Sequence, residues 1–104
     1  MTNDDRRSER VTWLRVELAD VIERCERGEI DVRQLAARSG ELTNQEEVDH
    51  LGDALLQHTY WAMQHAYQRP ACWAPSAKEM IYLRRCLQDE ELFDPDQIDT
   101  NVHP

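Results

Sequence analysis

Apolar residues recur through most of this chain at the three- and four-residue spacing of an amphipathic α-helix. The longest such stretch covers residues 44–68 and predicts a single long helix. One side of that helix carries small and apolar residues, which we expect to face a core: Val48, Leu51, Gly52, Leu55, Leu56, Thr59, Ala62, Met63 and Ala66. The other segments are expected to pack around this stretch, because it has the longest face to bury.

Two more stretches predict long helices, one before and one after it. The first starts at Ser8, which can cap a helix N-terminus, and stops at Gly28, which can adopt the left-handed conformation that ends a helix. The second starts with a capping-box sequence at residues 76–79 and continues to residue 87 or 91. Both carry an apolar row on one side, so both are expected to pack against the central stretch.

A short helix of two or three turns is predicted between the first two long ones, capped by Asp31 and ended by Gly40. No segment shows the alternation of polar and apolar residues that is typical of a β-strand. We therefore predict an all-α fold, a compact bundle of three long helices plus one short helix that forms one domain over residues 1–104. Residues 1–7 are expected to be frayed, and residues 89–104 to form an acidic C-terminal arm. The predicted core includes Leu14, Leu18, Leu51, Leu55, Ala62, Leu83 and Leu87.

Negative charge is concentrated in two parts of the sequence. The net charge is −9; residues 39–68 contain five acids and residues 86–104 contain six, and neither segment has a Lys or Arg. The remainder carries ten acids and twelve basic residues, so it is slightly positive. A surface of this kind repels nucleic acid and attracts basic proteins over long distances. It favours a basic protein partner and argues against direct nucleic-acid binding.

The polar side of residues 44–68 combines some of these acids with two large aromatic side chains. We predict that one contiguous partner-binding face, uninterrupted by positive charge, is formed there by six residues: Glu46, Asp49, Asp53, Gln57, Tyr60 and Trp61. Tyrosine and tryptophan supply much of the binding energy at protein interfaces. The alternative is that the loop around Trp73 or the C-terminal arm covers the two aromatic side chains.

The first predicted helix has a second, part-apolar face. Trp13 and Val16 lie there beside Glu17 and Asp20, on the side opposite to the predicted core. The alternative is that a short segment folds over Trp13.

No set of residues has the spacing of a catalytic or metal site. The single Glu-x-x-His, at residues 47–50, is not matched by the second one that a di-metal site in a helical bundle needs. Cys25, Cys72 and Cys86 lack C-x-x-C spacing. The sequence also has no phosphate-binding loop, dinucleotide fingerprint or G-x-S-x-G. We therefore expect neither an enzyme nor a bound metal or cofactor.

Nucleic acid and membranes are also not expected as partners. Residues 35–40 look like the start of a helix-turn-helix, but the next helix opens with Glu46 and Glu47, which would repel phosphates. No run is long and apolar enough to span a membrane, and the first residues lack the apolar segment of a secretory signal. We therefore expect a cytoplasmic protein that is a monomer or a weak homodimer.

In element lengths and charge, residues 14–61 resemble the small acidic helical immunity proteins of nuclease toxins, of the colicin-D type. The likeness consists of an opening helix, then Gly28-Glu29-Ile30 leading into a short helix with Leu35, then an acid-bearing helix that ends in aromatic residues. Proteins of that family cover the basic RNA-binding cleft of a tRNA-cleaving toxin with an acidic surface.

The resemblance implies that Glu46, Asp49 and Asp53 imitate phosphates in the cleft of a toxin. We therefore favour an acidic protein-binding module, an immunity or inhibitor protein that neutralises a basic nuclease-type toxin by covering its nucleic-acid-binding or active-site cleft. Two other classes remain open: an acidic, phage-type mimic of DNA that blocks a nucleic-acid-binding enzyme, and a helical adaptor or regulatory subunit in which Trp13 and Trp61 dock into a neutral groove. Added salt distinguishes them, because it weakens charge mimicry and not hydrophobic docking.

Overall fold

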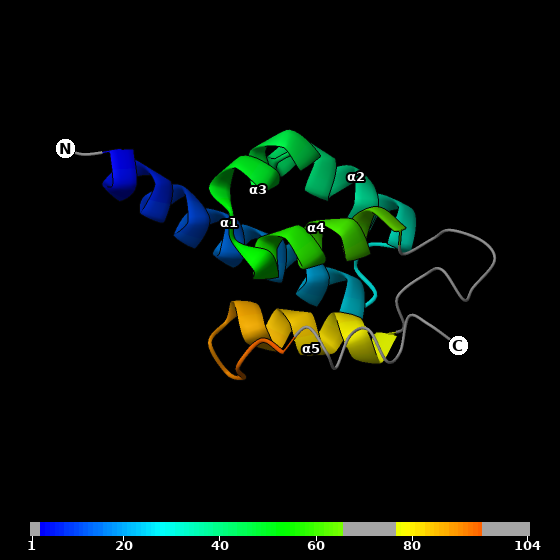
Figure 1. Ribbon diagram of the computed structural model, residues 1–104. Helices are drawn as coiled ribbons and strands as arrows, with labels where there is room; N and C mark the ends of the chain where they lie inside the picture. The colour runs from blue at the N-terminus through cyan, green and yellow to red at the C-terminus, as the bar shows by residue number, and fades with distance from the viewer. Residues whose placement is uncertain (1–2, 66–76, 95–104) are drawn as a thin grey trace.

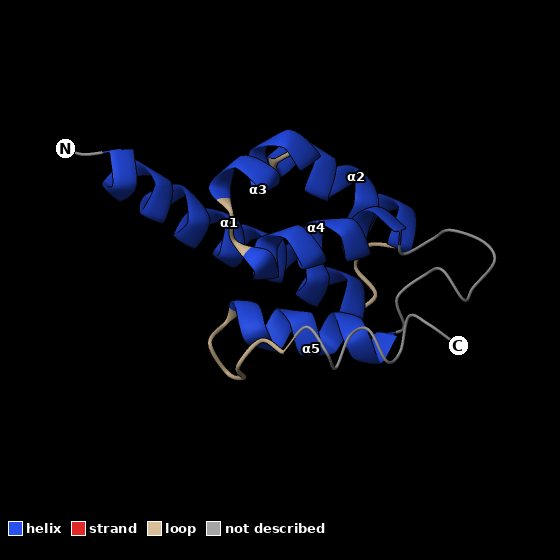
Figure 2. Ribbon diagram, in the orientation of Figure 1, coloured by secondary structure: helices blue, strands red, loops and turns tan. Residues whose placement is uncertain are grey.

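A computed structural model describes residues 3–65 and 77–94 of the 104-residue chain. These residues form five helices and no strand (Figure 1, Figure 2), namely α1 (Asn3–Glu26), α2 (Val32–Leu42), α3 (Gln45–Leu51), α4 (Ala54–His65) and α5 (Ala77–Leu87). The predicted all-α fold is confirmed, whereas the number and the lengths of the helices differ from the prediction. None of the described helices is long and apolar enough to cross a membrane.

Helix α4, from the central stretch, contacts each of the other four helices. Helix α1, the longest, packs along α5 and α2 and also contacts α4. Helix α5 runs antiparallel to α1, while α2 and α3 arch over the opposite side of the bundle (Figure 1). The first turns of α1 extend beyond the other helices (Figure 1).

The core lies where the apolar rows of these helices meet. All seven predicted core residues are buried, and none is more than 6% exposed. Leu56 and Met63, from the inner side of α4, are fully buried beside them. Burying an aliphatic side chain of this size stabilises the folded state by about 1.5–3 kcal/mol. The predicted inner face of residues 44–68 is therefore confirmed up to Met63 except at Gly52, which is exposed. Ala66 lies outside the described residues.

The prediction of one continuous helix over residues 44–68 is wrong, because α3 ends at Leu51 and α4 begins at Ala54. Gly52 adopts a left-handed φ of 69°, which ends α3. The Asp53 carboxylate accepts a hydrogen bond from the backbone N–H of Leu56 at 3.0 Å, which caps the start of α4. A glycine stop followed by an aspartate cap therefore turns the chain, and α4 packs back against α3.

Helix α1 begins earlier than predicted and ends as predicted. Its helical conformation starts at Asn3 rather than Ser8, so residues 3–7 are not frayed. The side chain of Arg7 contributes, because its Nε donates to the carbonyl of Leu51 at 2.9 Å and ties the first turns to the end of α3. The stop at Gly28 is confirmed: its φ is 77°, and the backbone N–H groups of residues 28 and 29 bond back to the last carbonyls of the helix.

Helix α2 begins as predicted and ends later. Asp31 and Gln34 form a capping box, with hydrogen bonds of 2.8 and 2.9 Å between each side chain and the backbone N–H of the other. The helix passes through Gly40 and stops at Leu42, so the predicted stop at Gly40 is wrong. The carbonyl of Leu42 accepts a hydrogen bond from Nη2 of Arg10 at 2.9 Å, and this contact from α1 satisfies the end of the helix.

The last part of the chain is described only in part. Helix α5 starts at Ala77, so the predicted capping box at residues 76–79 begins just outside the described residues. The loop with Trp73 and Cys72, and residues 95–104 of the predicted arm, also lie outside them. Within the described part of the arm, Phe93 packs against the core.

Candidate partner-binding surface

Helix α3 carries the first part of the predicted acidic face. The side chain of Asn44 caps it by accepting the backbone N–H of Glu47 at 2.7 Å, and the buried side chains of Val48 and Leu51 anchor it to the core. The outward side of the helix carries four exposed polar residues: Gln45, Glu46, Asp49 and His50. Acids in the first turn are also favoured by the positive end of the helix dipole.

Two acids in this region are neutralised by arginines of α1. Arg10 donates from Nε and Nη2 to the carboxylate of Glu47, at 3.0 and 2.9 Å. Nη2 of Arg15 lies 2.7 Å from Oδ2 of Asp53. The Arg10 hydrogen bond holds the pKa of Glu47 below its ordinary value. The prediction that no positive charge interrupts the acidic face is therefore wrong at Asp53. The Asp53 carboxylate also caps the start of α4 in the α3–α4 turn.

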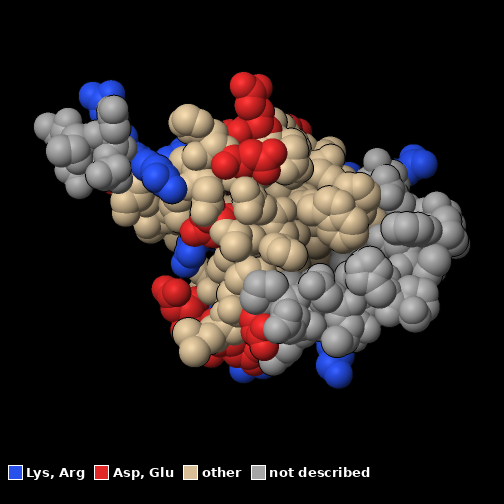
Figure 3. Space-filling model, viewed as in Figure 1, with Lys and Arg blue, Asp and Glu red and all other residues tan. Residues whose placement is uncertain are grey.

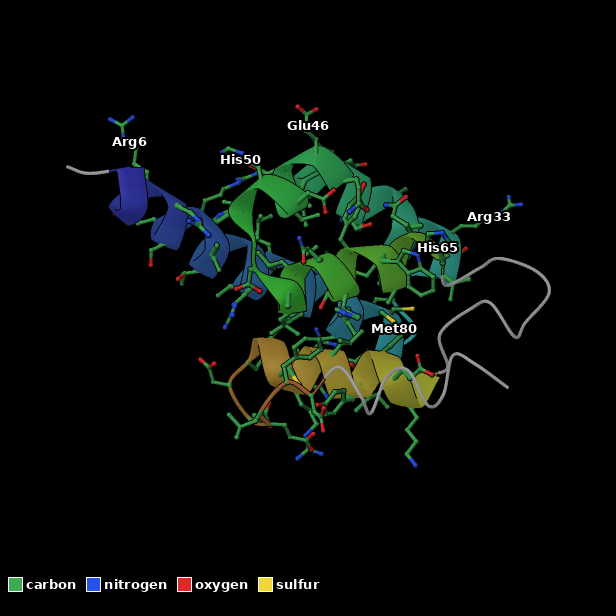
Figure 4. All side chains as sticks on the ribbon, viewed as in Figure 1. Arg6, Arg33, Glu46, His50, His65 and Met80 are labelled. Atoms are coloured by element: carbon green, nitrogen blue, oxygen red, sulfur yellow. The ribbon has the colours of Figure 1, made fainter. Side chains whose placement is uncertain are left out.

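Glu46 and Asp49 point outward from the same helix. Glu46 has no ion pair with any residue that the structure describes, and its side chain projects away from the body of the protein (Figure 4). Oδ1 of Asp49 accepts hydrogen bonds from the side-chain amides of Gln45 at 2.8 Å and of Gln57, on α4, at 3.5 Å. The space-filling view shows acidic side chains gathered over α3 (Figure 3). These two carboxylates are therefore accessible to a cationic partner.

The two neighbouring aromatic residues of the predicted face have different positions. Tyr60 is only 9% exposed and belongs to the core, so its predicted place on an exposed face is wrong. It lies one helical turn after the fully buried Leu56 and shares its inward direction. Trp61 is partly buried, and its indole stacks on the ring of His65, with centroids 4.4 Å apart and an angle of 20° between the planes. Of the two, only Trp61 is available to a partner.

The outward side of α4 carries a row of partly exposed residues: Gln57, His58, Trp61 and His65. The predicted face includes Gln57 and Trp61 but neither histidine. The ring of His58 lies near that of Phe93, with centroids 5.3 Å apart. The Gly-Asp pair at residues 52 and 53 is the signal that could have identified this row. It ends one helix and starts another, so the spacing of exposed positions has to be counted from the start of α4. Four of the six predicted site residues thus remain on the surface, with Asp49 and Gln57 joining the two helices.

The cysteines of the described residues are not arranged for reactivity. The pKa of the Cys25 thiol is raised mainly by burial, and so is that of Cys86, which keeps both thiols protonated at neutral pH. Cys72 lies outside the described residues. In the part of the chain that the structure describes, no group of three or more His, Cys, Asp or Glu side chains is placed to hold a metal ion.

Comparison with protein-family models, with curated proteins and with solved structures gives no match to this chain.

Proposed function

We propose that this chain is an acidic protein-binding module that acts as an immunity or inhibitor protein. It would neutralise a basic nuclease-type toxin by covering the nucleic-acid-binding or active-site cleft of that toxin. The observation that carries the proposal is the division of the acids on and beside α3. Glu47 and Asp53 are held by arginines of α1, while Glu46 and Asp49 point outward without a cationic partner among the described residues.

The paired acids make the outward acids better suited to binding. The contacts of Arg10 with Glu47 and of Arg15 with Asp53 fix α3 and the turn that follows it to α1. Carboxylates carried by a helix that is fixed in this way lose little conformational freedom when a partner binds them. Their negative charge also attracts a basic cleft over long distances and speeds association. This is the arrangement expected of groups that take the place of phosphates.

The α4 row adds contacts that do not depend on charge. Gln57 is tied to Asp49, and Trp61 follows it one turn later on the same side of α4. A tryptophan at the edge of a charged surface supplies apolar contact area, and such residues often dominate the energy of an interface. The partner surface that fits is a cleft lined with Lys and Arg that has an apolar wall.

The proposal carries further expectations about the protein. It would act in the cytoplasm, as a monomer or a weak homodimer, without a cofactor and without binding nucleic acid itself. Oligomeric state, bound cofactor and nucleic-acid binding can be measured on the purified protein, and location by fractionation of host cells.

Capture of the partner tests the proposal. The tagged chain is incubated with lysate of the native host at low salt, and the retained protein is identified, purified and assayed for cleavage of RNA and DNA. We expect a basic nuclease whose activity disappears when one equivalent of the chain is added. Retention of neutral or acidic proteins only, or a captured nuclease that stays active in the complex with its cleft open, would overturn the proposal.

A further inference from the structure

The side of α1 that faces away from the core exposes two apolar side chains one turn apart. Trp13 is 43% exposed and Val16 is 61% exposed. No segment among the described residues covers them, so the alternative that a short segment folds over Trp13 is not met by that part of the chain. An exposed tryptophan beside an exposed valine leaves apolar surface in contact with water, and such patches commonly mark interaction sites.

The indole of Trp13 is held in a fixed position. The guanidinium carbon of Arg10 lies 4.6 Å from the centre of its ring. That guanidinium group is itself fixed by hydrogen bonds to the Glu47 carboxylate and to the carbonyl of Leu42. Trp13 therefore rests on a cation that two other helices hold in place. A side chain that is ordered before binding gives up less entropy when a partner covers it.

The charges around this apolar pair are mainly negative. Glu9 lies one turn before Trp13 on α1 and Glu17 lies one turn after it. Asp20 follows Val16 by one turn and is paired with Arg24 at 2.9 Å. Glu9 has no ion pair with any of the described residues. The exposed apolar side chain of α5, Ile81, has the opposite surroundings, with Lys78 and Arg85 one turn away on either side. Between the α1 and α5 sites, only the α1 site suits a cationic partner. The other exposed large apolar side chain on a described helix is the isolated Val32, at the start of α2.

We propose that Trp13 and Val16 form a docking surface for a basic protein, which receives the indole in an apolar socket flanked by Lys or Arg. This inference rests on the proposed function in one respect, that the partner is basic. It adds an apolar anchor on a different helix from Glu46 and Asp49. The hydrogen bonds between Arg10 and Glu47 join this surface to α3, so one partner that wraps around the edge of the bundle can contact both.

The test uses two defined peptides of equal charge and a protein labelled with 5-fluorotryptophan. One peptide is an amphipathic helix of leucine and lysine, and the other is polylysine. The fluorine signal of Trp13 is assigned with the Trp13→Phe variant. We expect the leucine–lysine peptide to shift the Trp13 signal and to bind the Trp13→Ala variant at least tenfold more weakly than the unchanged protein. Polylysine should bind the acidic surface and leave the Trp13 signal in place.

Two further variants keep the result interpretable. Val16→Lys should weaken binding of the leucine–lysine peptide by a similar factor. The melting temperature of the free protein should stay unchanged, because the side chain of Val16 is exposed. Ile81→Ala, at the apolar site with basic neighbours, should leave peptide binding within twofold. Equal binding of the leucine–lysine peptide to the unchanged protein, Trp13→Ala and Val16→Lys would overturn the docking surface. If polylysine still binds in that case, the proposed acidic binding module is retained. If neither peptide binds the unchanged protein, the result counts against both proposals.

Discussion

Gly52 has a φ of 69°, and a Cβ added to it would lie 3.1 Å from Nη2 of Arg7. Gly52→Ala is therefore expected to destabilise the protein by about 1 kcal/mol or more. Gly40 is the matched control, because it lies inside α2 and the nearest atom to an added Cβ is 3.6 Å away. Gly40→Ala is expected to stabilise by roughly 0.5–1 kcal/mol. Unfolding in denaturant measures both changes, and equal effects at the two positions would contradict this account of the turn.

Leu55 tests the placement of the core at the same scale. Its side chain is 5% exposed, and Leu55→Ala is expected to cost about 2–5 kcal/mol of unfolding free energy. Ile81→Ala removes a side chain of similar size from a position that is 38% exposed, and should cost only about 0.5 kcal/mol. A reversible thermal melt of the two variants gives the comparison. A loss well under 1 kcal/mol at Leu55 would show that the inner side of α4 is assigned wrongly.

The core could be predicted from the sequence because burial follows helical spacing, and spacing is a local property. Leu51 and Leu55 lie on the inner side both of a continuous helix and of the broken one, so the error about the break did not affect them. The outward face was less predictable. The prediction for Tyr60 is wrong because the exposed side of a short helix depends on where that helix starts. The prediction for Asp53 is wrong because Arg15, which pairs with it, is distant in the sequence.

At the scale of helices, local signals located the starts of α2 and α3, but missed the start of α1 and the contacts between elements. The cap at Asp31 and the stop at Gly28 were readable, because each involves neighbouring residues only. The end of α2 was not, because its last carbonyl is bound by Arg10 of α1. The end of α3 has a local signal in Gly52, but the bond from Arg7 to its last carbonyl does not. Three arginines on α1 thus organise the helix junctions, a role that no pattern within the junctions themselves predicts.

The contact between Arg10 and Glu47 predicts a dependence of stability on pH. The pKa of Glu47 is lowered in the folded protein, chiefly by its hydrogen bond with Arg10. A lowered pKa means that the contact stabilises above the pKa of the unfolded carboxyl group, and that this stability is lost as the pH falls through the folded-state pKa. Glu47→Gln should therefore destabilise at neutral pH, by no more than about 1 kcal/mol for a pair that is partly exposed.

Melting curves of Glu47→Gln and the unchanged protein over a range of pH check this expectation. The difference between them should shrink in acid, once Glu47 is protonated. Glu46→Gln is the matched control on the same helix, since its carboxylate has no ion pair among the described residues. A constant difference for Glu47→Gln down to strongly acidic pH would contradict the assigned contact.

At the scale of the whole molecule, the excess of acid is not spread evenly over the surface. Two arginines of α1, Arg10 and Arg15, neutralise part of the acidic segment at Glu47 and Asp53, and Glu46 and Asp49 are left facing outward. Composition alone indicates an acidic protein, but only the packing of α1 against the helix junctions determines which acids are left for a partner. The central claim of this account is that those two acids, rather than the net charge, bind the partner.

The affinity for the captured basic partner, measured as a function of salt, tests that claim most directly. The double variant Glu46→Gln/Asp49→Asn is compared with Glu90→Gln, which removes an exposed acid near the end of α5. The account predicts that the affinity of the unchanged protein falls steeply with salt. The double variant should lose about 2–5 kcal/mol of binding free energy where these acids meet buried Lys or Arg of the partner. Its affinity should also depend less on salt. Glu90→Gln should behave like the unchanged protein. An affinity that is insensitive to salt, or a double variant that binds within twofold of the unchanged protein, would contradict it.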